Sequence, residues 1–130
     1  QTFTASTSAI LAAQRILDTL TSGDFFGDHG RVMQVRNRFM SHIEKIRAEH
    51  PDWIKGPFGE GAMIAFTPFD GSDATVKKLL TDLFDAGIVA FVCGANPARI
   101  RFLPPVGAIS DSDIDAVANI LQNVLAAHSK

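Results

Sequence analysis

The stretch that decides the fold is Ala98-Arg99-Ile100-Arg101-Phe102-Leu103-Pro104-Pro105, followed by the helix start Ser110-Asp111-Ser112-Asp113. Alternate residues of a strand lie on opposite faces, so Arg99 and Arg101 share one face. Ile100 and Phe102 share the other, and they predict packing on a core. The two guanidinium groups then either bind a carboxylate through paired hydrogen bonds or lie in solvent. Spacing alone favours the solvated surface, because exposed arginines are common and their ion pairs are weak.

Three further segments have the length and composition of strands. Residues 62–67 predict a buried strand that ends at Pro68. Residues 88–93 form a continuous apolar run, which is typical of a strand covered on both faces. Residues 53–58 are interrupted by Gly56-Pro57, which favours a place at the edge of a sheet.

Helical spacing of apolar side chains predicts helices at residues 8–22, 31–50 and 72–87, and from residue 110 toward the C-terminus. Their apolar stripes are Ile10, Ala13, Leu17 and Leu20; Val32, Val35, Phe39, Ile43 and Ile46; Val76, Leu79, Leu80, Leu83 and Phe84; and Ile114, Val117, Leu121 and Val124. Ser72 and Ser110 are predicted N-caps, the second in a capping box with Asp113, and Gly87 is a predicted C-terminal cap. The connection at residues 24–30 carries Phe25 and Phe26, expected to lie under a neighbouring element.

The order of these elements predicts an α+β fold. We expect residues 1–130 to form a single two-layer small domain, with a short three- or four-stranded, mostly antiparallel sheet and helices on one face. A formal net charge of -2 gives no electrostatic footprint for nucleic acid or for an acidic membrane. The lone Cys93 excludes an internal disulfide and is expected to be a buried small residue, so the cytoplasm is the expected location.

Local motifs for other chemistries are weak. The four histidines, at 29, 42, 50 and 128, are not spaced as paired zinc ligands, so no metal site is expected. No G-x-S-x-G motif is present, and no catalytic residue is predicted. The cluster Gly56, Gly59 and Gly61 precedes a strand instead of a helix, which favours a structural turn over a phosphate cradle.

Several segments together resemble the class III aminotransferases. Gln1-Thr2-Phe3-Thr4-Ala5-Ser6-Thr7-Ser8-Ala9 is similar to the family's T-F-G-G-N-P-L-A, and Arg101-Phe102-Leu103-Pro104-Pro105 resembles its R-x-x-P-P. Between them, Gly59-Glu60-Gly61-Ala62-Met63-Ile64 is similar to R-G-x-G-L-M-x-G, and Asp85-Ala86-Gly87-Ile88-Val89 to the A-G-V-x-V step. The motifs occur in the family's order over nearly the whole chain.

The resemblance implies the C-terminal small domain of a fold type I, pyridoxal 5'-phosphate-dependent aminotransferase that moves an amino group between an amino acid and a 2-oxo acid. It implies that Arg101 holds the substrate α-carboxylate and that Thr2 contacts the cofactor phosphate in the neighbouring subunit of a homodimer. Residues 1–22 would link from an absent large domain, which carries the Schiff-base lysine. No lysine of this chain matches that position, so the chain alone is expected to be inactive. Arg99 has no role by resemblance and is left as a surface or interface residue.

A different class of function stays open. A free-standing α+β module would use its sheet to dimerise and its arginine face to bind an anionic metabolite. The amino donor and acceptor cannot be predicted from this sequence, because their specificity lies mostly in segments that it does not contain. We expect the sequence to be a piece of something longer, since it starts at Gln1, directly before a helix.

Overall fold

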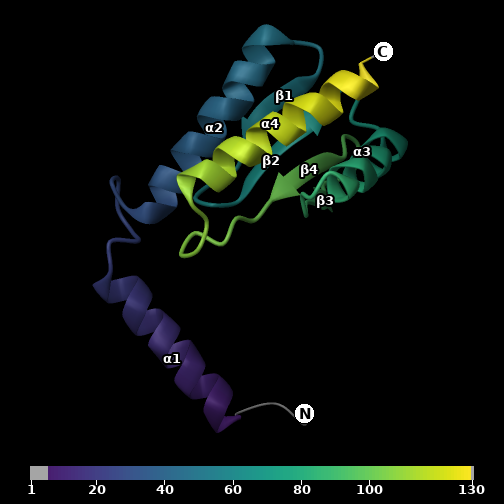
Figure 1. The fold of residues 1–130 in the computed structure, drawn as a ribbon. Helices are drawn as coiled ribbons and strands as arrows, with labels where there is room; N and C mark the ends of the chain where they lie inside the picture. The colour runs from purple at the N-terminus through teal and green to yellow at the C-terminus, as the bar shows by residue number, and fades with distance from the viewer. Residues whose placement is uncertain (1–5, 130) are drawn as a thin grey trace.

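The computed structural model describes residues 6–129, which form helices and strands arranged as in Figure 1. The helices are α1 (Thr7–Ser22), α2 (Arg31–Glu49), α3 (Asp73–Asp85) and α4 (Asp111–His128). The strands are β1 (Ile54–Phe58), β2 (Ile64–Pro68), β3 (Phe91–Cys93) and β4 (Arg99–Phe102). The predicted helices are present, and the short extended segment at residues 53–58 forms a strand, so two strands lie between α2 and α3.

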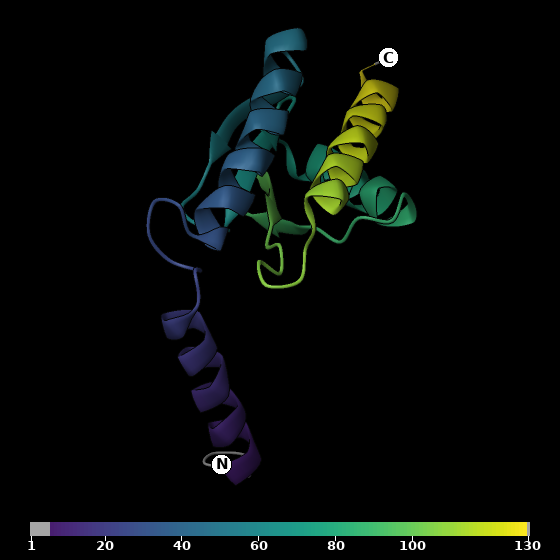
Figure 2. The ribbon, with the colours of Figure 1, turned by 60° about the vertical axis from the view of Figure 1, so that its left-hand side comes forward.

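The strands make one sheet in the order β1-β2-β4-β3, and every neighbouring pair is antiparallel. The helices α2 and α4 run side by side across one face, and α3 packs beside α4 at the β3 end (Figures 1 and 2). The expected two-layer α+β fold is therefore confirmed. Residues 53–58 lie at the edge of the sheet, as Gly56-Pro57 indicates.

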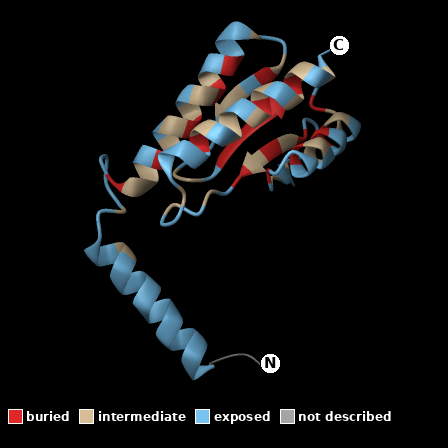
Figure 3. Cartoon of the chain, in the orientation of Figure 1, coloured by how far each residue is buried: buried red, intermediate tan, exposed pale blue. Residues whose placement is uncertain are grey.

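The core lies between the sheet and the helices, where Figure 3 shows the buried residues. Ile100 and Phe102 point into it, with exposed fractions of 0% and 4%, whereas Arg99 and Arg101 are half-buried on the other face. The ring of Phe102 lies between those of Phe39 and Phe66, at centroid distances of 5.7 and 6.1 Å. The alternation of arginine and apolar residues along β4 thus determines which face of the sheet the helices cover.

The helix caps form as predicted. The Ser110 hydroxyl accepts a hydrogen bond from the backbone N–H of Asp113 at 3.1 Å, and the Asp113 carboxylate accepts one from the backbone N–H of Ser110 at 2.8 Å. The Ser110 hydrogen bonds lower the pKa of Asp113. Ser72 caps α3, and Gly87, with φ at +98°, follows its last turn in a conformation that favours glycine.

Three predictions about burial are wrong. Only Phe91–Cys93 of the run 88–93 forms a strand, and it lies exposed at the sheet edge because β4 is its single neighbour. Cys93 is consequently half-buried instead of a core residue. Phe84 is 67% exposed, since it lies beside the inward stripe of α3 that Val76, Leu79 and Leu83 form.

Helix α1 extends away from the rest of the fold and has no buried residue (Figures 1 and 3). Its apolar side chains Ile10, Leu11, Ile16 and Leu17 are each at least 54% exposed. Phe25 is half-buried near Gly107, whereas Phe26 is 63% exposed, so only one ring of that pair is covered as expected. The described residues thus leave an amphipathic helix without a partner for its apolar side.

A charged cluster joins α2 to α4. The Arg38 guanidinium donates two hydrogen bonds to the Asp115 carboxylate, from Nε at 2.9 Å and from Nη2 at 2.6 Å. The His42 ring contacts the same carboxylate, with 2.8 Å between Nε2 and Oδ1. These hydrogen bonds, that of Arg38 first, hold the pKa of Asp115 below its usual value. The cluster therefore stabilises the pairing of the two helices only while Asp115 is ionised.

This gives a pH-dependent prediction. A carboxylate whose pKa is lowered by folding stabilises the protein above its unfolded-state pKa, about 3.9, and the stabilisation is lost as pH falls through the lower folded-state value. Asp115→Asn is expected to lower the free energy of unfolding at pH 7, and the gap to wild type should close below about pH 4. Urea unfolding at each pH measures this difference in the free energy of unfolding.

Asp52→Asn is the control, because Asp52 is an exposed carboxylate outside the ion pairs of residues 6–129. A gap for Asp115→Asn that does not change with pH would contradict the prediction.

Candidate functional site

The candidate site lies on the face of the sheet opposite α2 and α4, which we call the open face because no helix of residues 6–129 covers it. Strand pairing places its residues in two rows. The first row consists of Lys55, Thr67, Arg99 and Cys93, in which Lys55 pairs with Thr67 and Arg99 pairs with Cys93. The second row consists of Phe58, Ala65, Arg101 and Phe91. The open face therefore combines cationic side chains with small residues on β2 and aromatic residues on the outer strands.

The centre of the open face is nearly inaccessible to solvent at β2. Ala65 and Thr67, on β2, are only 8% and 3% exposed although no helix packs on them in the described part of the chain. They have small side chains next to β4, so the long aliphatic parts of Arg99 and Arg101 can lie over them. The two arginines are themselves half-buried, and the Nε atom of Arg101 is fully covered.

Arg101 keeps its hydrogen-bonding capacity largely unused. Its one side-chain contact of hydrogen-bond type within residues 6–129 is from Nη1 to the sulfur of Met63, at 3.9 Å, and a thioether is a weak acceptor. Its Nε is buried and has no partner in the same residues. No carboxylate of the described chain lies within 4.0 Å of its guanidinium nitrogens. A permanently charged fork on a half-buried surface is suited to an incoming carboxylate.

Arg99 differs from Arg101 in its surroundings. Its guanidinium carbon lies 4.6 Å from the centre of the Phe58 ring, which is a cation–π contact. Its Nε donates to the Thr67 hydroxyl at 3.4 Å. Both contacts come from the chain itself, so Arg99 has a structural role across β1, β2 and β4 that the sequence did not suggest.

Comparison with known proteins identifies the family. The model of the class III aminotransferases matches residues 1–125. The chain belongs to the class III aminotransferases. This confirms the resemblance that the sequence motifs indicated, and pyridoxal phosphate is the cofactor that this family generally uses.

Individual class III aminotransferases are similar at low identity. L-lysine-epsilon aminotransferase of Mycobacterium tuberculosis (strain ATCC 25618 / H37Rv) is 25% identical over 119 residues, which cover 89% of this chain and 24% of that protein. Acetylornithine aminotransferase of Listeria monocytogenes serotype 4b (strain F2365) is 27% identical over 124 residues, which cover 95% of this chain and 29% of that protein. The chain therefore spans about a quarter of the length of these relatives.

Solved structures of class III aminotransferases share the fold. The lysine aminotransferase from M. tuberculosis superposes with a TM-score of 0.75 at 24% identity, over 90% of this chain and 25% of that one. The acetylornithine aminotransferase from Elizabethkingia anophelis gives a TM-score of 0.72 at 24% identity, over 87% of this chain and 28% of that one. At 24% identity, these superpositions show that the chain shares its fold with those proteins.

The family's cofactor forms a Schiff base with a lysine, and the described lysines do not fit that role. Lys45, Lys55, Lys77 and Lys78 are all exposed, whereas a Schiff-base lysine is activated by a desolvated pocket. Thr2, the residue predicted to contact the cofactor phosphate, lies outside the described residues. Among the residues predicted to have a role in the site, Arg101 is therefore the one that the structure describes.

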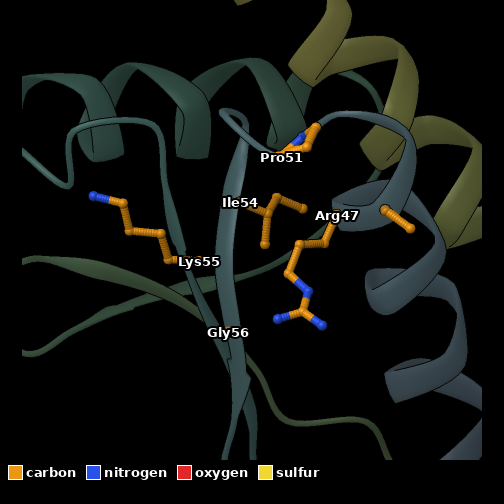
Figure 4. Close-up of a pocket in the computed structure, with 6 residues that line it drawn as sticks. Arg47, Pro51, Ile54, Lys55 and Gly56 are labelled. Carbon is orange, nitrogen blue, oxygen red and sulfur yellow. The ribbon is translucent and has the colours of Figure 1, made fainter.

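A separate hollow lies at the edge of the sheet. A hollow of about 480 Å³ beside β1 is lined by Arg47, Ala48, Pro51, Ile54, Lys55 and Gly56. Figure 4 shows Arg47 and Lys55 on opposite sides of the β1 ribbon, and Arg47 is already paired with Glu44. Within residues 6–129 no three His, Cys, Asp or Glu side chains come together as metal ligands. Nor does any helix in that range have the length and hydropathy to span a membrane.

Proposed function

We propose that this chain is the C-terminal small domain of a pyridoxal-phosphate-dependent aminotransferase, and that Arg101 holds the α-carboxylate of its amino-acid substrate. The observation that carries the proposal is that Arg101 is half-buried on the open face, and that within residues 6–129 the thioether of Met63 is the one side-chain acceptor in contact with its guanidinium. The planar guanidinium group of arginine binds a carboxylate through two charge-assisted hydrogen bonds, and this fixes the orientation of the substrate.

The rest of the polypeptide would complete the site. An exposed guanidinium binds an anion weakly in water, since the solvent screens the charge. A second surface closing over the open face would exclude water and strengthen the contact. We propose that a large domain, joined through residues 1–22, supplies this surface together with the Schiff-base lysine. The exposed apolar side of α1 fits such a linking role, because a partner would bury it.

The proposal includes pyridoxal phosphate as the cofactor and a homodimer as the assembly, and membership of the class III aminotransferases supports the first of these. When bound, pyridoxal phosphate supplies the electron sink for amino-group transfer. The chain's own contribution is to bind and orient the substrate carboxylate through Arg101, and to contact the cofactor phosphate through Thr2 across the interface of a homodimer. We propose the cytoplasm as the site of action, since a chain with a single cysteine has no internal disulfide.

The test compares this chain with the full-length polypeptide that contains it. Full-length protein loaded with pyridoxal phosphate is expected to transfer an amino group to a 2-oxo acid, and L-lysine and acetylornithine are the first donors to try because of the relatives' names. The chain of residues 1–130, incubated with the cofactor and borohydride, is expected to give no stoichiometric adduct, because its described lysines are exposed. Mass spectrometry detects the adduct.

Two results would contradict the proposal. One is a full-length protein that transfers no amino group from any amino-acid donor. The other is a stoichiometric, borohydride-reduced adduct at one lysine of residues 1–130. A coding sequence without a large domain upstream of Gln1 would instead support the free-standing module.

A further inference from the structure

Met63 lies just before β2, and its side chain contacts Arg101 on the open face. Its side chain is 47% exposed, yet its sulfur is 3.9 Å from Nη1 of the guanidinium. Because it is so exposed, burial in the core does not explain the presence of a large apolar residue here. Within residues 6–129, the contact with Arg101 is the one hydrogen-bond-type interaction of its side chain.

The backbone of Met63 is fixed by the turn that precedes β2. Its N–H donates to the carbonyl oxygen of Glu60 at 3.1 Å. Gly59 has φ at +115°, and a Cβ on it would collide with the carbonyl oxygen of Met63. The glycine-containing segment at residues 59–63 therefore fixes the point on the backbone from which the Met63 side chain extends.

Arg101 has little else to hold it in one orientation. It lies opposite Ala65 on β2 and Phe91 on β3, and neither side chain offers a hydrogen-bond acceptor. An unrestrained arginine has many rotamers, and fixing them on binding lowers affinity. A carboxylate at the position of Met63 would restrain the guanidinium but would also neutralise it. A thioether restrains it through a weak contact and leaves its charge available.

We infer that Met63 is a positioning residue for Arg101. Its thioether holds the guanidinium over β2 in an orientation that receives the substrate carboxylate, without competing for it. This inference rests on the function proposed above, and it assigns a role to the segment 59–63 beyond that of a turn.

The test uses the full-length enzyme. Met63→Ala is expected to raise the KM for the amino donor about five- to tenfold, with kcat within about twofold, because only the preorganisation of the guanidinium is lost. Met63→Leu, which keeps the apolar bulk but has no sulfur, is expected to raise KM nearly as much as Met63→Ala, because the contact is made by the thioether; a wild-type KM in Met63→Leu would contradict a role for the sulfur. Met63→Glu is expected to raise KM about 100-fold, because the new carboxylate pairs with Arg101. Met33→Ala is the control. Met33 is a half-buried methionine on α2, away from the open face, so its replacement is expected to leave KM unchanged.

A double-mutant cycle separates positioning from a general structural effect. Adding Met63→Ala to an Arg101→Ala enzyme is expected to change KM less than twofold, since the residue to be positioned is already gone. Equal effects in both backgrounds would overturn the inference, as would an unchanged KM in Met63→Ala. In either case the proposed function stands if Arg101→Ala alone raises KM. If Arg101→Ala leaves KM unchanged, the proposed function and the inference both fail.

Discussion

Replacing Arg101 with alanine in the full-length protein is expected to raise the KM for the amino-acid donor about 100-fold, while kcat falls severalfold at most. Truncating one partner of a hydrogen-bonded charge pair costs about 2–5 kcal/mol, and each 1.4 kcal/mol corresponds to a factor of ten. The α-carboxylate is present in both the ground state and the transition state, so most of the loss appears in KM. Steady-state kinetics with varied donor measure it, and cofactor absorbance checks that pyridoxal phosphate stays bound.

The same strand provides a matched control. Arg99→Ala removes a guanidinium from the same face of β4, but one that is held by Phe58 and Thr67. We expect its KM to stay within about threefold of wild type, whereas Arg101→Lys, which keeps the charge but loses the fork, should fall between wild type and Arg101→Ala. Equal effects of Arg99→Ala and Arg101→Ala would mean that the open face acts through its total charge and that Arg101 has no specific role.

Phe66→Ala is expected to lower the free energy of unfolding by about 3–5 kcal/mol. Phe66 is 0% exposed, at the centre of β2, and its ring lies 6.1 Å from that of Phe102. Removing the ring leaves a cavity between β2 and the helices. The expected loss is a large part of the total free energy of unfolding of a domain, which is about 5–15 kcal/mol. Urea unfolding can be followed through Trp53, the one tryptophan of the chain, which stacks on His50 at 3.7 Å.

Phe84→Ala is the control for this stability measurement. The Phe84 ring is 67% exposed on α3, so we expect its removal to change the free energy of unfolding by less than about 0.5 kcal/mol. If Phe84→Ala were as destabilising as Phe66→Ala, the described packing of the sheet against the helices would be wrong.

The elements and the inner face of the sheet could be predicted because short-range patterns specify them. Alternation in the arginine strand separated Ile100 and Phe102 from Arg99 and Arg101, and the structure has the same separation. The capping residues Ser72 and Ser110 act within one turn of the chain, so their role could also be predicted. In both cases the determining contacts are with residues nearby in the sequence or with any apolar partner.

Features that depend on partners distant in the sequence were missed. The apolar run 88–93 does not reveal that β3 has one neighbour only, so its exposure was mispredicted. The contacts of Met63 with Arg101, and of Phe58 with Arg99, depend on the register between β1, β2 and β4. That register is set by the whole sheet, and a single sequence has no local signal for it.

The apolar stripe of α1 is a further case. Its spacing predicted a helix correctly, but the pattern does not say which surface covers it. In the described residues that surface is missing, which agrees with a chain that spans about a quarter of its relatives.

The central claim is that Arg101 recognises the substrate through its α-carboxylate, and the most direct test changes the substrate together with the residue. We would measure kcat/KM for the amino donor and for its α-carboxamide, with wild-type and Arg101→Ala full-length enzyme. The wild type is expected to prefer the carboxylate about 100-fold, and this preference should nearly vanish in Arg101→Ala. An equal preference in the two enzymes would show that another group binds the carboxylate, and the proposed role of Arg101 would be wrong.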